Sequence, residues 1–210
     1  MILDKLSKHK YNYLLLLGHV GTDINQGALP ALMPFLIQEY SLSYAKAAGL
    51  IFACNLISSI VQPLFGHLGD KMHKPQLLYL ALFLSGAGIS LMGFVHSYLA
   101  LFISAMISGV GVALFHPEGS KLANMVSTGE KATGVGIFSV GGNIGFALGP
   151  IIVVVALAIF GMKGLIAFVL ITILTSLLLF LNMKGLIAKT KLYHETSKKK
   201  RLRVMQKKIV

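Results

Sequence analysis

Apolar residues gather into long runs that short polar connections separate. Six runs are long enough to cross a bilayer core as a helix, which takes about 20 residues. They are Tyr11–Ile37, Ala47–Leu68, Gln76–Val95, Leu99–Met125, Ala132–Phe160 and Gly164–Met183. This pattern predicts an all-α, polytopic membrane protein with six transmembrane helices in residues 1–183. Residues 184–210 are polar and basic without apolar periodicity, which predicts a flexible cytosolic tail.

Composition agrees with a membrane protein. Of the 210 residues, 55% are hydrophobic and 12% are charged, whereas a soluble domain carries roughly 25% charged residues. So few charges cannot coat a surface in water, which argues against a soluble globular enzyme. The single cysteine, Cys54, lies inside the second run and excludes a disulfide framework.

The positions of the charges predict an orientation. The net charge is +12, and if the N-terminus is cytosolic, all but two of the 19 Lys and Arg residues lie on the cytosolic side. The outer connections hold only Lys46 and Lys163. The positive-inside rule therefore predicts a multi-pass protein of the cell (inner) membrane with both termini cytosolic. Ten of the cations lie in the tail, which favours attraction to anionic lipid over nucleic acid as a partner.

The first run carries polar side chains that are costly at membrane depth. His19, Asp23 and Gln26 are spaced i, i+4 and i+7, so they share one face of a helix. A charged side chain at mid-bilayer costs at least about 2.5–3.5 kcal/mol, and such residues usually face a cavity or a partner. This face therefore predicts part of a substrate or proton pathway.

The fourth run holds a second polar pair, His116 and Glu118. This run crosses in the opposite direction, which predicts nearly the same depth for its pair as for His19 and Asp23. If the two runs are neighbours, the four side chains form one cluster that can take up and release a proton. Two alternatives stay open. The cluster is a static hydrogen-bonded brace between helices, or Glu118 simply pairs with Lys121 at i+3.

The fifth run combines one amide with a stripe of small residues. Gly141, Gly145 and Gly149 recur at every fourth position, and Pro150 follows the last of them. In lipid such a stripe lets a second helix approach closely, so packing is the preferred interpretation of the glycines. Asn143, near the middle of the run, is the better candidate for lining a cavity.

Motifs of known catalytic chemistry are absent from the sequence. It contains no His-Glu-x-x-His, no Walker loop, no Cys-x-x-Cys and no Gly-x-Ser-x-Gly. His19 and Asp23, completed by His116 and Glu118, could in principle hold a metal ion. Without a recognised intramembrane hydrolase motif, the sequence predicts neither an enzyme nor a metal site, and no cofactor.

Several segments resemble a known transporter family. GHLGDKMHK, residues 66–74, is similar to the signature loop between helices two and three of the major facilitator superfamily. GGNIGFALGP, residues 141–150, is similar to its glycine-rich helix-five motif. More narrowly, His19–Pro34, Gly109–Gly119 and Phe138–Pro150 resemble, in order and spacing, the fosmidomycin-resistance type of efflux protein.

This resemblance implies a secondary transporter, an antiporter that expels small drugs in exchange for protons. It also implies that the first and fourth helices line the central cavity. A conformational motif is expected at Gly66, Gly69, Asp70 and Lys71, with Asp70 as its acid. Many proton-coupled drug exporters of the superfamily carry an arginine in helix four, but Ala105 stands at that position here. His116, Glu118 and Asp23 therefore become the better candidates for proton coupling.

The resemblance covers only one half of the superfamily's fold. Its members have twelve helices in two six-helix halves with the substrate between them, so the partners of Asp70 and of the glycine face at residues 141–149 are expected in the other half. Three outcomes stay open: a truncated or split product that does not transport, pairing with a separate six-helix half, or a homodimer. The expected function is proton-coupled efflux that is inactive or partner-dependent in the half-length chain. The alternative is a non-transporting accessory or truncated membrane protein.

Overall fold

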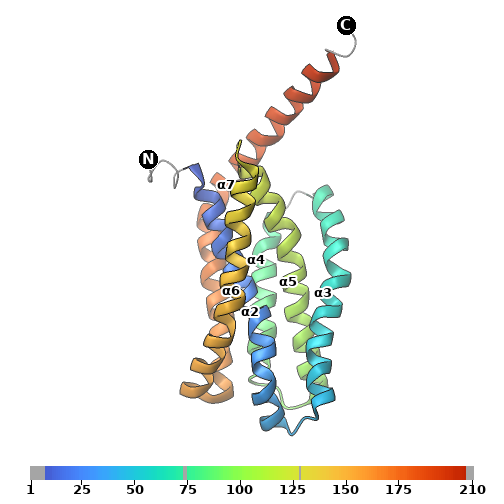
Figure 1. The fold of residues 1–210 in the computed structure, drawn as a ribbon, viewed down its shortest axis with the longest axis vertical. Coiled ribbons are helices and arrows are strands. Elements are labelled where there is room, and N and C mark those ends of the chain that lie inside the picture. The colour runs from blue at the N-terminus through green and yellow to red at the C-terminus, as the bar shows by residue number, and fades with distance from the viewer. Residues whose placement is uncertain (1–7, 73–74, 128, 207–210) are drawn as a thin grey trace.

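Helices make up the described part of the chain, which comprises residues 8–72, 75–127 and 129–206 of the computed structural model, without the side chains of 68–72, 194 and 197–206. The elements are α2 (Lys10–Tyr40), α3 (Tyr44–Met72), α4 (Leu77–Leu91), α5 (Tyr98–Val126), α6 (Lys131–Phe160), the short 3-10 helix η1 (Gly161–Leu165) and α7 (Ile166–Gln206). They form an elongated bundle in which η1 reverses the chain at the end opposite the start of α2 (Figure 1). The predicted all-α class is therefore confirmed.

Three stretches of the described chain are long and apolar enough to cross a membrane: Tyr44–His67, Tyr98–Val126 and Lys131–Tyr193. The third has 63 residues, far more than one crossing needs, and η1 divides it into α6 and α7. α4 has only 15 residues, because the chain turns directly after Leu91, and polar residues lower the hydropathy of α2. Length and composition thus show an integral membrane protein without showing all six predicted crossings.

α7 passes the predicted boundary at Met183 and continues as one helix to Gln206. The residues predicted to form a flexible tail are therefore helical as far as Gln206. The segment after Gly185 contains neither glycine nor proline and is rich in Lys, Arg and Leu, which favour the helix even where apolar periodicity has ended. In Figure 1 this part of α7 projects beyond the bundle at the end where α2 begins.

The glycine stripe of α6 packs against α2. A Cβ atom at Gly141 would lie 2.5 Å from the carbonyl oxygen of Leu16, and one at Gly145 would lie 2.6 Å from that of Val20. Only glycine permits this close approach of the two backbones. The expectation that this face awaits a partner in an absent half is therefore wrong, because the same chain supplies the partner.

The outer surface of the bundle is strongly apolar. Large side chains that are more than half exposed occur on α3, α6 and α7, including Phe52, Ile60, Ile151, Ile159, Phe160, Phe180 and Leu181. A water-soluble monomer rarely exposes so many large apolar groups together. This surface fits contact with lipid or with other apolar segments.

Candidate functional site

Three of the predicted polar residues meet inside the bundle, between α2 and α5. His19 Nε2 lies 3.2 Å from Asp23 Oδ2, and His116 Nε2 lies 3.4 Å from Asp23 Oδ1. The side chains of His19 and Asp23 are about nine-tenths buried, and that of His116 is 22% exposed. We call His19, Asp23 and His116 the histidine–aspartate cluster.

The orientation of His19 constrains the protons of this cluster. Its Nδ1 lies 2.8 Å from the carbonyl oxygen of Phe138, which can only accept, so Nδ1 carries a hydrogen. In the neutral ring Nε2 would then present a lone pair to the Asp23 carboxylate. A hydrogen bond between His19 and Asp23 therefore needs one further proton, on either the imidazole or the carboxyl group.

Two groups that the sequence interpretation missed hold His19 in this orientation. The ring of Phe138 on α6 stacks on His19 with 4.1 Å between ring centroids and 19° between planes. Gly142 lies so close that a Cβ atom there would be 2.7 Å from His19 Nε2 and 2.8 Å from Asp23 Oδ2. The Gly141-Gly142 doublet was the available signal, since Gly142 lies off the stripe that packs on α2.

The cluster borders an open cavity of about 540 Å³. Its lining comes from α2, α3, α5 and α6 and comprises Gln26, Ser58, Gln62, Val112, His116, Pro117, Ser120 and Phe138. His116 thus connects the buried carboxyl group to the cavity, and Gln26 lies where the sequence interpretation expected it. Ser58 and Gln62 were missed, although their i, i+4 spacing in an apolar run was a usable signal.

Glu118 does not join the cluster. Its Oε2 lies 3.4 Å from Lys121 Nζ, and both residues line a separate pocket together with Thr190 of α7. Successive residues turn by about 100° around a helix, so Glu118 points almost opposite to His116. The prediction that Glu118 is the fourth residue of the cluster is therefore wrong. The alternative, a pair of Glu118 with Lys121, is what the structure shows.

The remaining predicted residues lie elsewhere. Asn143 is exposed on α6 and does not line the cavity beside His116, and Pro150 lies half-buried further along the same helix. Gly66 faces α5, where a Cβ atom would contact Pro117 at 3.8 Å. The side chains of Gly69, Asp70 and Lys71 lie outside the described residues.

The cluster also has a geometry that a cation could share. One ligand atom each from His19, Asp23 and His116 lies within 4.8 Å of the others. His116 Nε2 lies 3.4 Å from Asp23 Oδ1, but this buried oxygen has no hydrogen-bond partner among the described residues.

Comparison with known proteins identifies the family. The family model described as Major Facilitator Superfamily matches residues 15–207. The chain belongs to the Major Facilitator Superfamily. This membership confirms the superfamily resemblance inferred from residues 66–74 and 141–150, and it makes the chain a member of a family of membrane transporters.

Two curated members of the superfamily are similar to the chain. It is 31% identical over 171 residues to the uncharacterised MFS-type transporter YfnC of Bacillus subtilis (strain 168), covering 80% of the chain and 42% of that protein. It is 33% identical over 163 residues to the fosmidomycin resistance protein of Escherichia coli (strain K12), covering 78% and 40%. The chain thus spans about two fifths of the length of these superfamily relatives.

A solved structure shows the same fold. The crystal structure of tetrameric PepTSo2 superposes with a TM-score of 0.66 and 20% sequence identity. The match covers 90% of this chain and 41% of that one. The bundle therefore shares its fold with the matching part of PepTSo2.

Proposed function

We propose that this chain supplies the proton-binding half of a secondary transporter that exports small drug-like molecules in exchange for protons. The observation that carries the proposal is the 3.2 Å contact between His19 Nε2 and Asp23 Oδ2 beside the polar cavity. Membership of the superfamily and similarity to a fosmidomycin resistance protein support the transport class.

The geometry suggests a proton route. With its proton, the His19–Asp23 pair is hydrogen-bonded and carries no net charge. Loss of that proton leaves a carboxylate facing a lone pair in a buried setting, which disfavours the arrangement. His116 lies between Asp23 and the cavity, so its imidazole can carry the proton between them. Polar groups such as Gln26 and Gln62 are available to a substrate in the same cavity.

We also propose six membrane crossings with both termini in the cytosol of the cell (inner) membrane. α2 begins and α7 extends at one end of the bundle, and η1 lies at the other (Figure 1). Lys46 lies in the first turn of α3 and Lys163 in η1, the regions proposed to face outward. Among the described cations, Lys10 lies at the start of α2, Lys121 in the last two turns of α5 and Lys131 at the start of α6, all toward the opposite end, as the positive-inside rule predicts.

Transport by this chain is proposed to require a second wall for the cavity. The described lining comes from four helices, and the cavity is open. A second six-helix half or a second copy of the chain can close it. Because α2 begins and α7 ends at the same end of the bundle, a linker can join two copies in tandem.

The test measures accumulation of fosmidomycin in a sensitive bacterial host. Cells produce the chain alone or as a tandem fusion of two copies, each as the parent, Asp23→Asn or Glu118→Gln. We expect the parent to lower accumulation in at least one form, and Asp23→Asn to abolish this effect. Glu118→Gln is the matched control, because its carboxyl group lies outside the cluster, and it is expected to retain export.

Two outcomes contradict the proposal. Export by Asp23→Asn equal to that of the parent would remove the cluster from the mechanism. If neither form of the parent changes accumulation while the chain co-purifies with another membrane protein, the accessory function replaces the transporter.

A further inference from the structure

An apolar groove lies at the η1 end of the bundle, away from the histidine–aspartate cluster. Its volume is about 690 Å³, within the range of small-molecule sites. The walls come from α6, η1 and α7, with Phe94 near the end of α4. Apart from Lys163, every side chain that lines it is apolar.

The length of the groove matches one leaflet. Its lining on α6 runs from Ile151 to Phe160, which is about 14 Å along a helix that rises 1.5 Å per residue. One leaflet of the hydrocarbon core is about 15 Å thick. The groove therefore extends over most of the depth that an acyl chain occupies.

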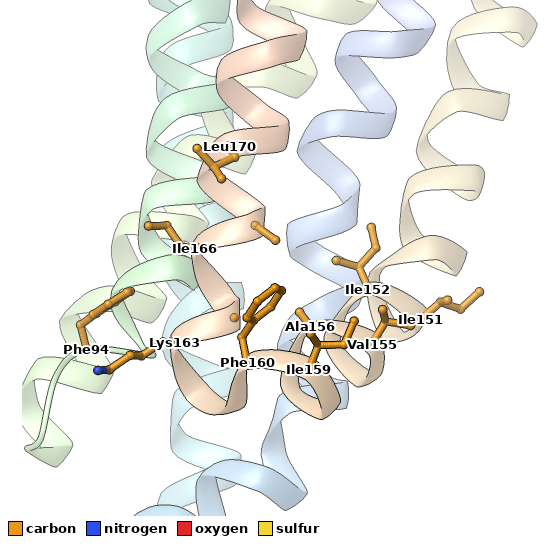
Figure 2. Close-up of a pocket in the computed structure, with 12 residues that line it drawn as sticks. Phe94, Ile151, Ile152, Val155, Ala156, Ile159, Phe160, Lys163, Ile166 and Leu170 are labelled. Atoms are coloured by element: carbon orange, nitrogen blue, oxygen red, sulfur yellow. The ribbon is translucent and has the colours of Figure 1, made fainter.

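Lys163 supplies a charge at the rim of the groove. It lies in η1, is exposed, and has no ion pair within the described residues. Figure 2 shows its amino group beside Phe94 and the ring of Phe160 between Lys163 and the α6 side chains Ile152 and Ala156. A single cation at the mouth of an apolar groove is complementary to a phosphate joined to an acyl chain.

We propose that this groove binds an anionic phospholipid, with one acyl chain between α6 and α7 and its phosphate on Lys163. An uncharged lipophilic compound would use the apolar walls equally well but would gain nothing from Lys163. A zwitterionic lipid carries its own cation, which opposes the lysine. The site is independent of the proposed transport activity, since none of its residues belongs to the histidine–aspartate cluster or its cavity.

The test uses the absence of tryptophan from the chain, which makes any introduced tryptophan the sole indole signal. Phe160→Trp reports on the groove. Phe83→Trp on α4 is the control, because Phe83 is also exposed but lies outside the groove. Each protein is reconstituted in mixed vesicles in which either phosphatidylglycerol or phosphatidylcholine carries brominated acyl chains. The ratio of the two quenching efficiencies gives the preference for the anionic lipid at that position.

We expect Phe160→Trp to prefer phosphatidylglycerol about fivefold, the size of effect of one lysine near an anionic surface. Adding Lys163→Gln should reduce the ratio to about one, Lys163→Arg should preserve it, and Phe83→Trp should give about one throughout. A ratio near one at Phe160→Trp, or one that Lys163→Gln leaves unchanged, overturns the proposal. If Phe160→Trp does not fold, Ile159→Trp serves as the groove reporter under the same criteria.

Discussion

The ring of His19 is oriented so that its Nε2 lies 3.2 Å from Asp23 Oδ2, one helical turn further along α2. Because Nδ1 of the same ring is used by the Phe138 carbonyl group, the contact with Asp23 depends on one shared proton. The protonation state of the His19 ring therefore reports whether this proton is present at the site.

Replacing Asp23 by asparagine should remove the shared proton without removing the contact with His19. The amide nitrogen of asparagine can donate to Nε2, so we expect His19 in Asp23→Asn to be a neutral ring with hydrogen on Nδ1 only. Nitrogen-15 NMR of labelled histidine measures this state, and His19→Gln assigns the signal among the seven histidines. A His19 that is doubly protonated in Asp23→Asn, or that carries its hydrogen on Nε2, would contradict this hydrogen-bond arrangement.

Gly142 should be intolerant of even a methyl group. The added carbon in Gly142→Ala would lie 2.7 Å from His19 and 2.8 Å from Asp23, and overpacking of this kind typically costs about 1–3 kcal/mol. Gly136→Ala on the same helix is the control, because nothing lies within 4 Å of its added carbon. We expect a lower melting temperature in detergent for Gly142→Ala and an unchanged or higher one for Gly136→Ala, since alanine favours the helix. Equal melting temperatures would refute the close approach.

Gly145 tests where the glycine stripe packs. In Gly145→Ala the new carbon would lie 2.6 Å from the backbone oxygen of Val20. A side chain could relieve such a clash by changing its rotamer, but a helix backbone cannot. The chain by itself should therefore melt at a lower temperature than the Gly136→Ala control. If the stripe instead packed on a separate partner, the isolated chain would show no loss.

The sequence predicted the parts of the site that follow from one helix at a time. The i, i+4 spacing of His19 and Asp23 determines their shared face, and depth alone was enough to bring His116 near them. Depth was not enough for Glu118, because the direction in which a side chain points around α5 decides which neighbour it meets. Gly142 and Phe138 were missed because their role depends on which face of α6 contacts α2, and the glycine doublet was the one signal for it in the sequence. The helical extension of α7 was missed because only apolar periodicity was considered and helix propensity was not.

Acid should weaken the ion-pair contacts that Glu130 makes with Lys8 and His9 at the end of the bundle where α2 begins. Glu130 accepts hydrogen bonds from Lys8 and His9, and these bonds, foremost that from Lys8, hold its pKa below the ordinary value of 4.5. A lowered pKa in the folded state gives stabilisation that is fully present above pH 4.5 and is lost as the pH falls through the folded value. The melting temperature of the parent should therefore exceed that of Glu130→Gln at pH 7, and the difference should shrink below pH 4.5. Glu39→Gln is the control, and a difference that does not depend on pH would exclude the ion pair as the cause.

The proposed topology predicts which positions a membrane-impermeant maleimide reaches in intact cells. The only native thiol, Cys54, is buried, and Cys54→Ala provides a background without reactive cysteine. On that background Lys46→Cys and Lys163→Cys should be labelled from outside, because they lie in the first turn of α3 and in η1, at the end proposed to face outward. Glu195→Cys, exposed on the part of α7 that extends beyond the bundle, should be labelled only after the cells are opened.

Labelling of Glu195→Cys in intact cells would contradict the cytosolic location of the C-terminal end of α7. Failure of Lys163→Cys alone would show that α6 and α7 do not form two separate crossings.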